Sequence, residues 1–188
     1  MTKQKTTKGK DKKENPMKEI EMEKLVLSIG AVGDELDKAS RLLNIISGMK
    51  AVKTRSRKRI PAFNIRPGLE IGCKVTLRGK KAEELLSRLL EAVNNQLKEK
   101  QIEPNGFSFG IPEYIEIPGM EYQREIGMLG LNITAVFKRK GKRTEIKKIK
   151  RGKIPQRQQV TREEIIKFMQ LNFKIKIQGR EGEEDDSK

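Results

Sequence analysis

Residues 69–100 read LEIGCKVTLRGKKAEELLSRLLEAVNNQLKEK, and they contain two periodicities one after the other. From residue 69 to residue 78 apolar and polar side chains alternate, which predicts a strand with one buried face and one polar face. From residue 79 to residue 100 apolar residues recur at helical spacing. A half-buried strand followed by an amphipathic helix indicates a sheet that helices cover on one side only. The apolar stripe predicted for this helix is Ala82, Leu85, Leu86, Leu89, Val93 and Leu97.

Further strands are predicted on both sides of this stretch. Residues 20–29 alternate at their start and are largely apolar later, and residues 131–137 alternate throughout. Shorter strands are predicted near Val52 and over residues 114–117. The glycines and prolines between residues 104 and 130 are expected to break any longer element there.

Two more helices are predicted from apolar spacing and from end signals. Residues 33–48 have an acidic first turn and end at Gly48, a natural helix stop. Residues 161–173 begin with Thr161 and Glu164 in capping-box spacing. The buried stripe predicted for residues 33–48 is Leu36, Ala39, Leu42, Leu43 and Ile46.

The order of these elements predicts an α+β fold. We expect a mostly antiparallel β-sheet with helices packed on one face, a polar second face and basic loops. Residues 15–177 are expected to form a single α+β domain. Residues 1–14, which are basic, and residues 178–188, which are acidic, have few apolar side chains and are predicted to be disordered tails.

The charge of the chain is concentrated in four segments. The 188 residues include 42 Lys plus Arg and 26 Asp plus Glu, for a net charge of +16. Residues 1–14 carry +4, residues 54–68 carry +5, residues 138–157 carry +10 and residues 180–188 carry −3. The remaining residues are therefore neutral overall. A balanced body with three basic arms predicts a polyanionic partner, either nucleic acid or an anionic membrane surface.

Residue types that common catalytic and metal sites need are scarce in this chain. There is no His, and Cys73, the one cysteine, lies on the apolar side of its predicted strand. We therefore expect no catalytic residue, no metal, no cofactor and no small-molecule substrate. No apolar run approaches the roughly 20 residues of a membrane span, and the N-terminus lacks the apolar centre of a signal peptide. We expect a soluble, cytoplasmic protein without a membrane partner.

Residues 54–68, TRSRKRIPAFNIRPG, combine cations with an isolated aromatic side chain between two prolines. Arg binds phosphates bidentately and stacks on bases, and Phe63 can rest on a ribose or on a splayed base. Membrane-binding arms instead favour amphipathic helices with several large apolar residues. The segment therefore indicates RNA as the partner. The side chains expected to take part are Arg55, Arg57, Lys58, Arg59, Phe63 and Arg66.

Several segments together resemble one family. Residues 15–52, the loop 54–68, the strand IGCKVTLRG and the segment 105–133 are similar to large-subunit ribosomal proteins of the universal L-five family. The later sequence KIPQRQQVTREEIIKF resembles the archaeal form. The resemblance implies a ribosome-bound structural protein without catalysis, which binds 5S rRNA and large-subunit rRNA near the central protuberance.

The resemblance also implies particular contacts with 5S rRNA. The family motif L-N-I/M-G-V-G is LSIGAVG here, so Ser28 stands where Asn is expected. The motif G-Q-K-P is GMKA here, so Met49 stands where Gln is expected. Thr76, Arg78 and Gly79 in VTLRG match the family. Because both departures remove an amide side chain, some hydrogen bonds to RNA must be made by other groups or lost.

Two further surfaces follow from the resemblance, and a third follows from the charge of residues 138–157. The loop 54–68 corresponds to a part that reaches toward transfer RNA in the peptidyl (P) site. The region from Phe107 to Gly130 corresponds to the part near the small-subunit head, where an intersubunit bridge to a head protein is expected. Other rRNA contacts are expected from Lys138, Arg139, Lys140, Lys142, Arg143, Lys147, Lys148, Lys150, Arg151 and Lys153.

Two other functions remain compatible with the residues alone. A free RNA chaperone would have the same basic arms but no preference for 5S rRNA over a transcript of equal size. An RNA-modifying enzyme is the second alternative, although the chain has neither a His nor a recognisable cofactor loop.

Overall fold

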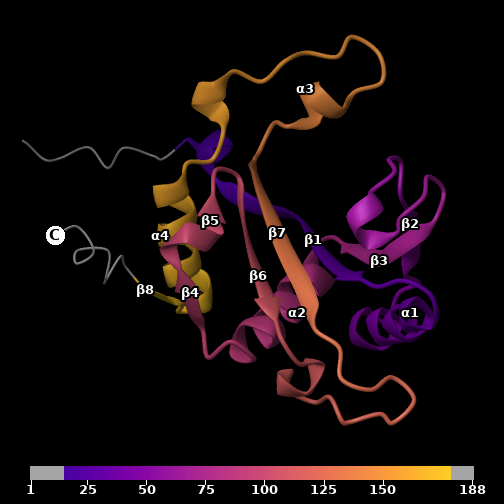
Figure 1. The fold of residues 1–188 in the computed structure, drawn as a ribbon. Helices are drawn as coiled ribbons and strands as arrows, with labels where there is room; N and C mark the ends of the chain where they lie inside the picture. Colours follow the sequence, from indigo (N-terminus) through magenta and orange to yellow (C-terminus); the bar gives the residue numbers. More distant parts are fainter. Residues whose placement is uncertain (1–14, 179–188) are drawn as a thin grey trace, which may run out of the picture.

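The computed structural model describes residues 15–178, and its centre is a six-stranded sheet of order β2-β3-β1-β7-β6-β5 (Figure 1). Every neighbouring pair in this sheet is antiparallel. A separate parallel pair joins β4 to β8. The predicted α+β class is confirmed. The strands are β1 (Ile20–Gly30), β2 (Val52–Arg55), β3 (Glu70–Leu77), β4 (Gln96–Lys98), β5 (Ile102–Glu103), β6 (Gly106–Ile111), β7 (Leu131–Arg139) and β8 (Lys176–Gln178).

Three helices pack on one face of the sheet, and a fourth lies apart from it (Figure 1). The packed helices are α1 (Asp34–Ser47), α2 (Lys80–Glu91) and α4 (Arg162–Phe173), while the short α3 (Arg143–Ile146) belongs to the long basic segment after β7. Their apolar stripes form one buried cluster with the inward side chains of the sheet. All five residues predicted to be buried on α1 are buried, and Gly48 ends that helix in the left-handed conformation.

The central strands alternate between this core and an open face. On β1 the core residues are Leu25, Leu27 and Ile29, and on β3 and β7 every second residue is likewise buried. The residues between them face the other way and are mostly polar, although Val26 and Val136 are among them. Because strand periodicity is two, a single register places most of the apolar side chains inside and leaves the second face largely polar, as predicted.

The helix predicted over residues 79–100 is shorter than expected. The α-helix α2 ends at Glu91, and Asn94 and Asn95 then adopt positive φ angles that turn the chain. Leu97 is buried, but it reaches the core from β4, and Val93 is only partly buried. Both apolar residues fit a continued helical stripe, so the stripe alone did not reveal the turn.

The strand predicted over residues 114–117 is wrong, and a real strand lies just before it. Tyr114–Glu116 form a 3₁₀ turn, and the buried Tyr114 hydroxyl accepts a hydrogen bond from the backbone N–H of Gln123 at 2.9 Å. The missed strand is β6, which buries Phe107 and Phe109. Its glycines resemble strand breakers in the sequence. At Gly106, however, an added Cβ would stand 2.5 Å from a carbonyl oxygen of β7, so glycine permits the close pairing.

The predicted tails lie almost entirely outside the described residues. Residues 1–14 and 179–188 are not described, and Gln178 forms the end of β8. The strands of both halves of residues 15–178 join one sheet, because β1 pairs with β3 on one side and with β7 on the other.

Candidate nucleic-acid interface

The open face of the sheet carries the first set of predicted RNA contacts. Ser28 on β1 is opposite Lys74 on β3 and opposite Asn132 on β7. One row along, Thr76 and Thr134 flank Val26 from the two neighbouring strands. These rows place hydroxyl, amide and ammonium groups side by side on a surface that the core does not use.

Arg78 and Gly79 lie at the end of this face, directly after β3. The Arg78 guanidinium donates one long hydrogen bond, 3.4 Å, to the carbonyl oxygen of Glu23 on β1. Gly79 precedes α2 with a φ of 69°, which an L side chain adopts only with strain. The fold therefore accounts for the glycine by itself, while most of the Arg78 donors stay available to a ligand.

Met49 lies in the connection between α1 and β2, the strand at one edge of the sheet. It follows α1, and its side chain is 45% exposed. Val52, three residues later, is opposite Lys74 and is also exposed. The structure thus brings Ser28 and Thr76 onto one face, with Arg78 directly after β3, while Met49 lies in the connection that leads into the edge strand β2.

Asn132 and Lys74 are open-face residues that the sequence analysis did not single out. Both side chains are exposed, and both are direct cross-strand neighbours of Ser28. The Oδ1 atom of Asn132 would lie 3.3 Å from a Cβ built on Gly110, so the amide lies beside a residue that has no side chain. The alternation of residues 131–137 was a signal that Asn132 faces outward, but the strand order that puts it beside Ser28 has no local signal.

The loop 54–68 closes on itself through backbone hydrogen bonds. Ser56 N–H donates to the Leu69 carbonyl at 2.9 Å, and Gly68 N–H donates to the Ser56 carbonyl at 2.9 Å. Farther out, Ile60 and Ile65 form an isolated antiparallel bridge. These bonds give the loop a defined shape and place the 3₁₀ turn Pro61–Phe63 at its outer end.

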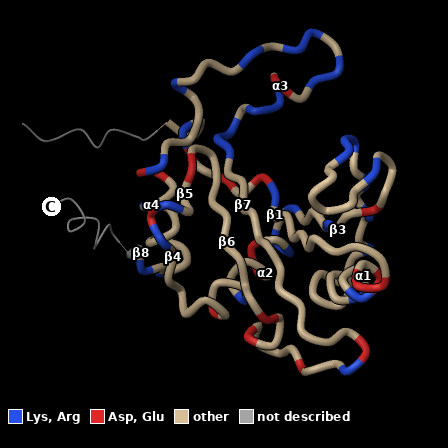
Figure 2. Tube along the Cα trace, in the orientation of Figure 1, with Lys and Arg blue, Asp and Glu red and all other residues tan. Residues whose placement is uncertain are grey.

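The loop presents an exposed aromatic ring together with four cations that form no ion pair with a described residue. Phe63 is 75% exposed. Arg55 differs from the other cations, because it pairs with Glu70 at 3.3 Å. The remaining cations form no ion pair within the described residues, and Figure 2 shows their charge at the outer part of the loop. These four are Arg57, Lys58, Arg59 and Arg66.

The long basic segment after β7 is partly neutralised where it leaves the sheet. Arg139, whose side chain is 14% exposed, pairs with Glu164 of α4 at 2.6 Å. Lys140 pairs with Glu19, and Lys142 pairs with Glu23 at 2.6 Å. These three cations therefore hold the segment against β1 and α4. The other predicted rRNA contacts, which form no ion pair within the described residues, are Lys138, Arg143, Lys147, Lys148, Lys150, Arg151 and Lys153.

The ion pairs lower the pKa values of two carboxylates, Glu23 and Glu164. Burial raises the pKa of Glu23, but the hydrogen bond and the charge of Lys142 outweigh it, so the net pKa lies below the usual 4.5. Burial likewise raises the pKa of Glu164, and hydrogen bonds from Thr161 and Arg139 again bring the net pKa below 4.5. Both acids therefore remain charged partners at neutral pH.

Cys73 is 1% exposed, and burial raises the pKa of its thiol, which favours the small apolar role predicted for it. Within residues 15–178 no cluster of three or more His, Cys, Asp or Glu side chains is arranged to hold a metal. In the same part of the chain no helix is long and apolar enough to cross a membrane.

Comparison with known proteins identifies the family. A family model described as ribosomal protein L5 matches residues 15–66, and a second model, which describes the C-terminus of the same ribosomal protein family, matches residues 70–173. The chain belongs to the ribosomal L5 family. It is 46% identical over 167 residues to the large ribosomal subunit protein uL5 of Nanoarchaeum equitans, a match that covers 87% of this chain and 99% of that protein.

Other archaeal relatives agree with this membership. The uL5 protein of Sulfolobus acidocaldarius is 42% identical over 88% of this chain and 95% of its own length. That of Methanobrevibacter smithii is 38% identical over 86% of this chain and 96% of its own length. The archaeal-type resemblance is therefore confirmed. The chain is a structural constituent of the large ribosomal subunit and not an enzyme.

Proposed function

We propose that this uL5-family protein binds 5S rRNA with the open face of its sheet and helps to hold that RNA in the central protuberance of cytoplasmic ribosomes. The observation that carries the proposal is the set of exposed polar groups in cross-strand register around Ser28 and Thr76. A flat row of hydroxyl, amide and cationic groups suits the shallow minor groove of RNA, where 2′-hydroxyls and base edges are displayed.

Asn132 can supply the side-chain amide that is absent at position 28, where the family has Asn and this chain has Ser. The two residues are opposite each other on neighbouring strands, and directly opposed side chains lie about 4.5–5.5 Å apart at Cβ. An amide on β7 can therefore reach RNA atoms close to those that an Asn on β1 would reach. The shorter Ser28 hydroxyl leaves room for this approach.

The loop 54–68 is proposed to contact the P-site transfer RNA. Its unpaired cations suit phosphates, and the exposed Phe63 ring suits a ribose or an unstacked base. Arg55 contributes less than its neighbours, because Glu70 already neutralises it.

Residues 112–130 suit a protein partner better than RNA. They contain four Glu and a single Arg, and Figure 2 shows this acidic loop at the opposite end of the molecule from the basic segment after β7. An acidic surface is repelled by phosphates and attracted by a basic protein. This charge supports an intersubunit bridge to a protein of the small-subunit head.

Two measurements test the proposal. Tagged protein should sediment with large subunits and remain bound in high salt, whereas a free RNA chaperone should wash off. Purified protein should also bind 5S rRNA more tightly than a transcript of equal size. Equal affinity for the two RNAs would contradict the proposed role in holding 5S rRNA.

A further inference from the structure

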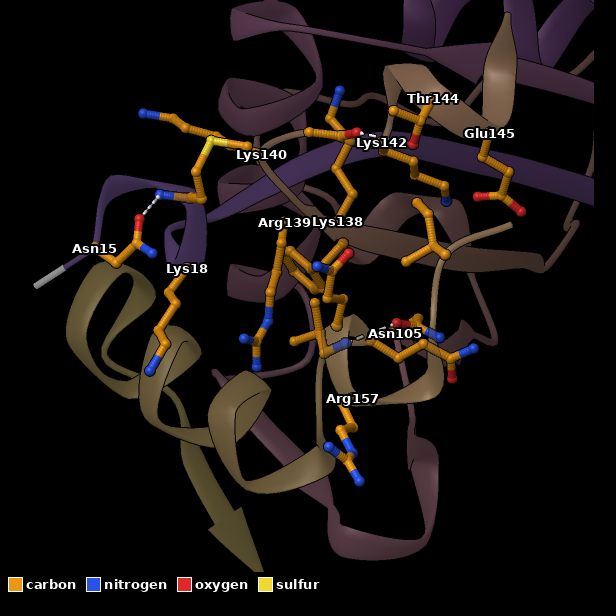
Figure 3. A pocket seen from close by; sticks show the side chains of 17 residues that line it. Asn15, Lys18, Asn105, Lys138, Arg139, Lys140, Lys142, Thr144, Glu145 and Arg157 are labelled. Carbon is orange, nitrogen blue, oxygen red and sulfur yellow. Dashed lines mark hydrogen bonds between the residues drawn. The ribbon is translucent and has the colours of Figure 1, made fainter. Parts of the chain in front are cut away.

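A recess lies at the end of the sheet, where β7 passes into the basic segment. It has a volume of about 550 Å³, which is within the roughly 300–1,000 Å³ of pockets that hold small ligands. Its walls come from the N-terminal turn, the β5–β6 turn, the end of β7 with the basic segment, and the residues before α4. Figure 3 shows Asn15 and Lys18 on one side of this recess and Thr144 and Glu145 on the other.

Asn105 joins three of these walls. Its carbonyl oxygen accepts from the Phe137 N–H at 2.7 Å, and its N–H donates to the Val160 carbonyl at 3.1 Å. Its side-chain Oδ1 accepts from the Val160 N–H at 2.9 Å. The fourth wall is the N-terminal turn. Lys140 connects the basic segment to it by pairing with Glu19, which directly precedes β1, and with Glu21 on β1. The recess is therefore built before any ligand arrives, so binding requires little ordering of the chain.

The cations around the recess divide into two groups. Arg139, Lys140 and Lys142 are paired with carboxylates of the body. Lys18, Lys138 and Arg157 form no ion pair with a described residue, and they come from three different walls. Because none of these three charges is held in an ion pair, they can attract an anion that is placed among them.

The remaining lining is not that of a simple phosphate site. Gln158 and Gln159 are exposed, and their side chains have no hydrogen-bond partner among the described residues. Met17 lies against the Gly141 backbone, where its terminal methyl would stand 2.7 Å from an added Cβ, and Ile154 adds further apolar surface. Amides recognise the edge of a base, and apolar side chains support its flat face.

We propose that this recess binds one unpaired RNA nucleotide, with its phosphate among Lys18, Lys138 and Arg157 and its base against Met17 and the Gln158–Gln159 amides. The inference rests on the proposed RNA-binding function and adds a second, separate site to it. A base within a duplex cannot enter, because its two faces are stacked on neighbouring bases and its Watson–Crick edge is paired. The site therefore selects a bulged or single-stranded position of an RNA.

The test is fluorescence anisotropy with a labelled short oligouridylate, the same RNA as a duplex, and heparin as a polyanion without bases. Gln158→Ala with Gln159→Ala keeps the charge and should weaken oligouridylate binding about fivefold or more while leaving heparin binding unchanged. Gln123→Ala with Gln170→Ala, two exposed amides outside the recess, should change neither. Lys18→Ala with Arg157→Ala should weaken oligouridylate binding more than Lys81→Ala with Lys167→Ala, which removes the same charge elsewhere.

Three results would overturn the inference. These are unchanged oligouridylate binding by the Gln158 and Gln159 variant, equal binding of the duplex, or tighter binding of an acidic peptide than of the oligouridylate. Cross-linking a 4-thiouridine oligonucleotide gives a second readout, and cross-links should fall within residues 15–18, 137–145 or 154–160. The 5S rRNA affinity of the same variants separates the two proposals. If it is lost only on Thr76→Ala with Arg78→Ala, the open-face function stands even when the recess fails.

Discussion

Replacing Thr76 and Arg78 by Ala tests the open face directly. Removing a neutral hydrogen bond costs about 0.5–1.5 kcal/mol, and removing one to a charged group costs about 1.5–3 kcal/mol. Thr76 has an exposed hydroxyl, and Arg78 uses only one long bond within the protein, so both side chains are available to RNA. We expect the double variant to bind 5S rRNA about 2–4 kcal/mol more weakly, which is about 30- to 1,000-fold in Kd.

The assay is a filter-binding titration of 5S rRNA at several salt concentrations. If Arg78 neutralises one phosphate, the plot of log K against log salt should become shallower by about 0.7–0.9 in variants that lack it. Thr76→Ala alone should lower the affinity without changing the slope. Because both side chains are exposed, urea unfolding should give a free energy within about 0.5 kcal/mol of the wild type.

The matched control replaces Arg57, Lys58 and Arg59, which are exposed and unpaired in the loop 54–68. This variant should keep its affinity for 5S rRNA and lose contact with P-site transfer RNA on the ribosome. The reverse pattern would refute the assignment, because it would mean that the two surfaces have been exchanged. Wild-type binding that did not change between low and moderate salt would refute the electrostatic account as a whole.

Three further predictions concern single residues. Asn132→Ala should weaken 5S rRNA binding about threefold to tenfold in the same titration, and an unchanged Kd would exclude its amide from the contact. The depressed pKa of Glu164 stabilises the fold above the usual pKa of 4.5, and this contribution is lost as pH falls through the folded-state pKa, so Glu164→Gln should flatten the acid side of a stability profile measured by urea unfolding. Gly106→Ala should destabilise the protein by about 1–3 kcal/mol, because the new Cβ would stand 2.5 Å from the Ala135 carbonyl. Gly30→Ala, which meets nothing within 4 Å, is its control, and equal loss of stability in both would contradict the steric reason.

Local patterns predicted the main elements because those elements bury one face. The alternation over residues 69–78 and the stripe on α1 are direct consequences of strand and helix geometry, and both proved correct. The capping box of α4 was equally readable, since Thr161 N–H donates to the Glu164 side chain at 3.1 Å. The prediction failed for β6, where glycines that permit close strand pairing were indistinguishable from glycines that break a strand.

Some basic residues form ion pairs within the protein and others stay available to RNA, and the composition does not distinguish the two groups. Arg139, Lys140 and Lys142 belong to the most basic segment, yet their charges are compensated by carboxylates of α4 and β1. The cations of the loop 54–68, apart from Arg55, have no such partners within the described residues. A count of Lys and Arg therefore overestimates the charge that each segment offers to RNA.

The sequence alone was enough to predict the fold class, the neutral net charge of the body, the basic segments and the family. Periodicity, charge and motif are all properties of residues that lie close together in the sequence. The tertiary structure alone decided which distant residues meet. Strand order brought Asn132 beside Ser28, and the turn at Asn105 joined the walls of the recess lined by Lys18 and Arg157. Such neighbours depend on how the whole sheet is assembled, and no local pattern records that.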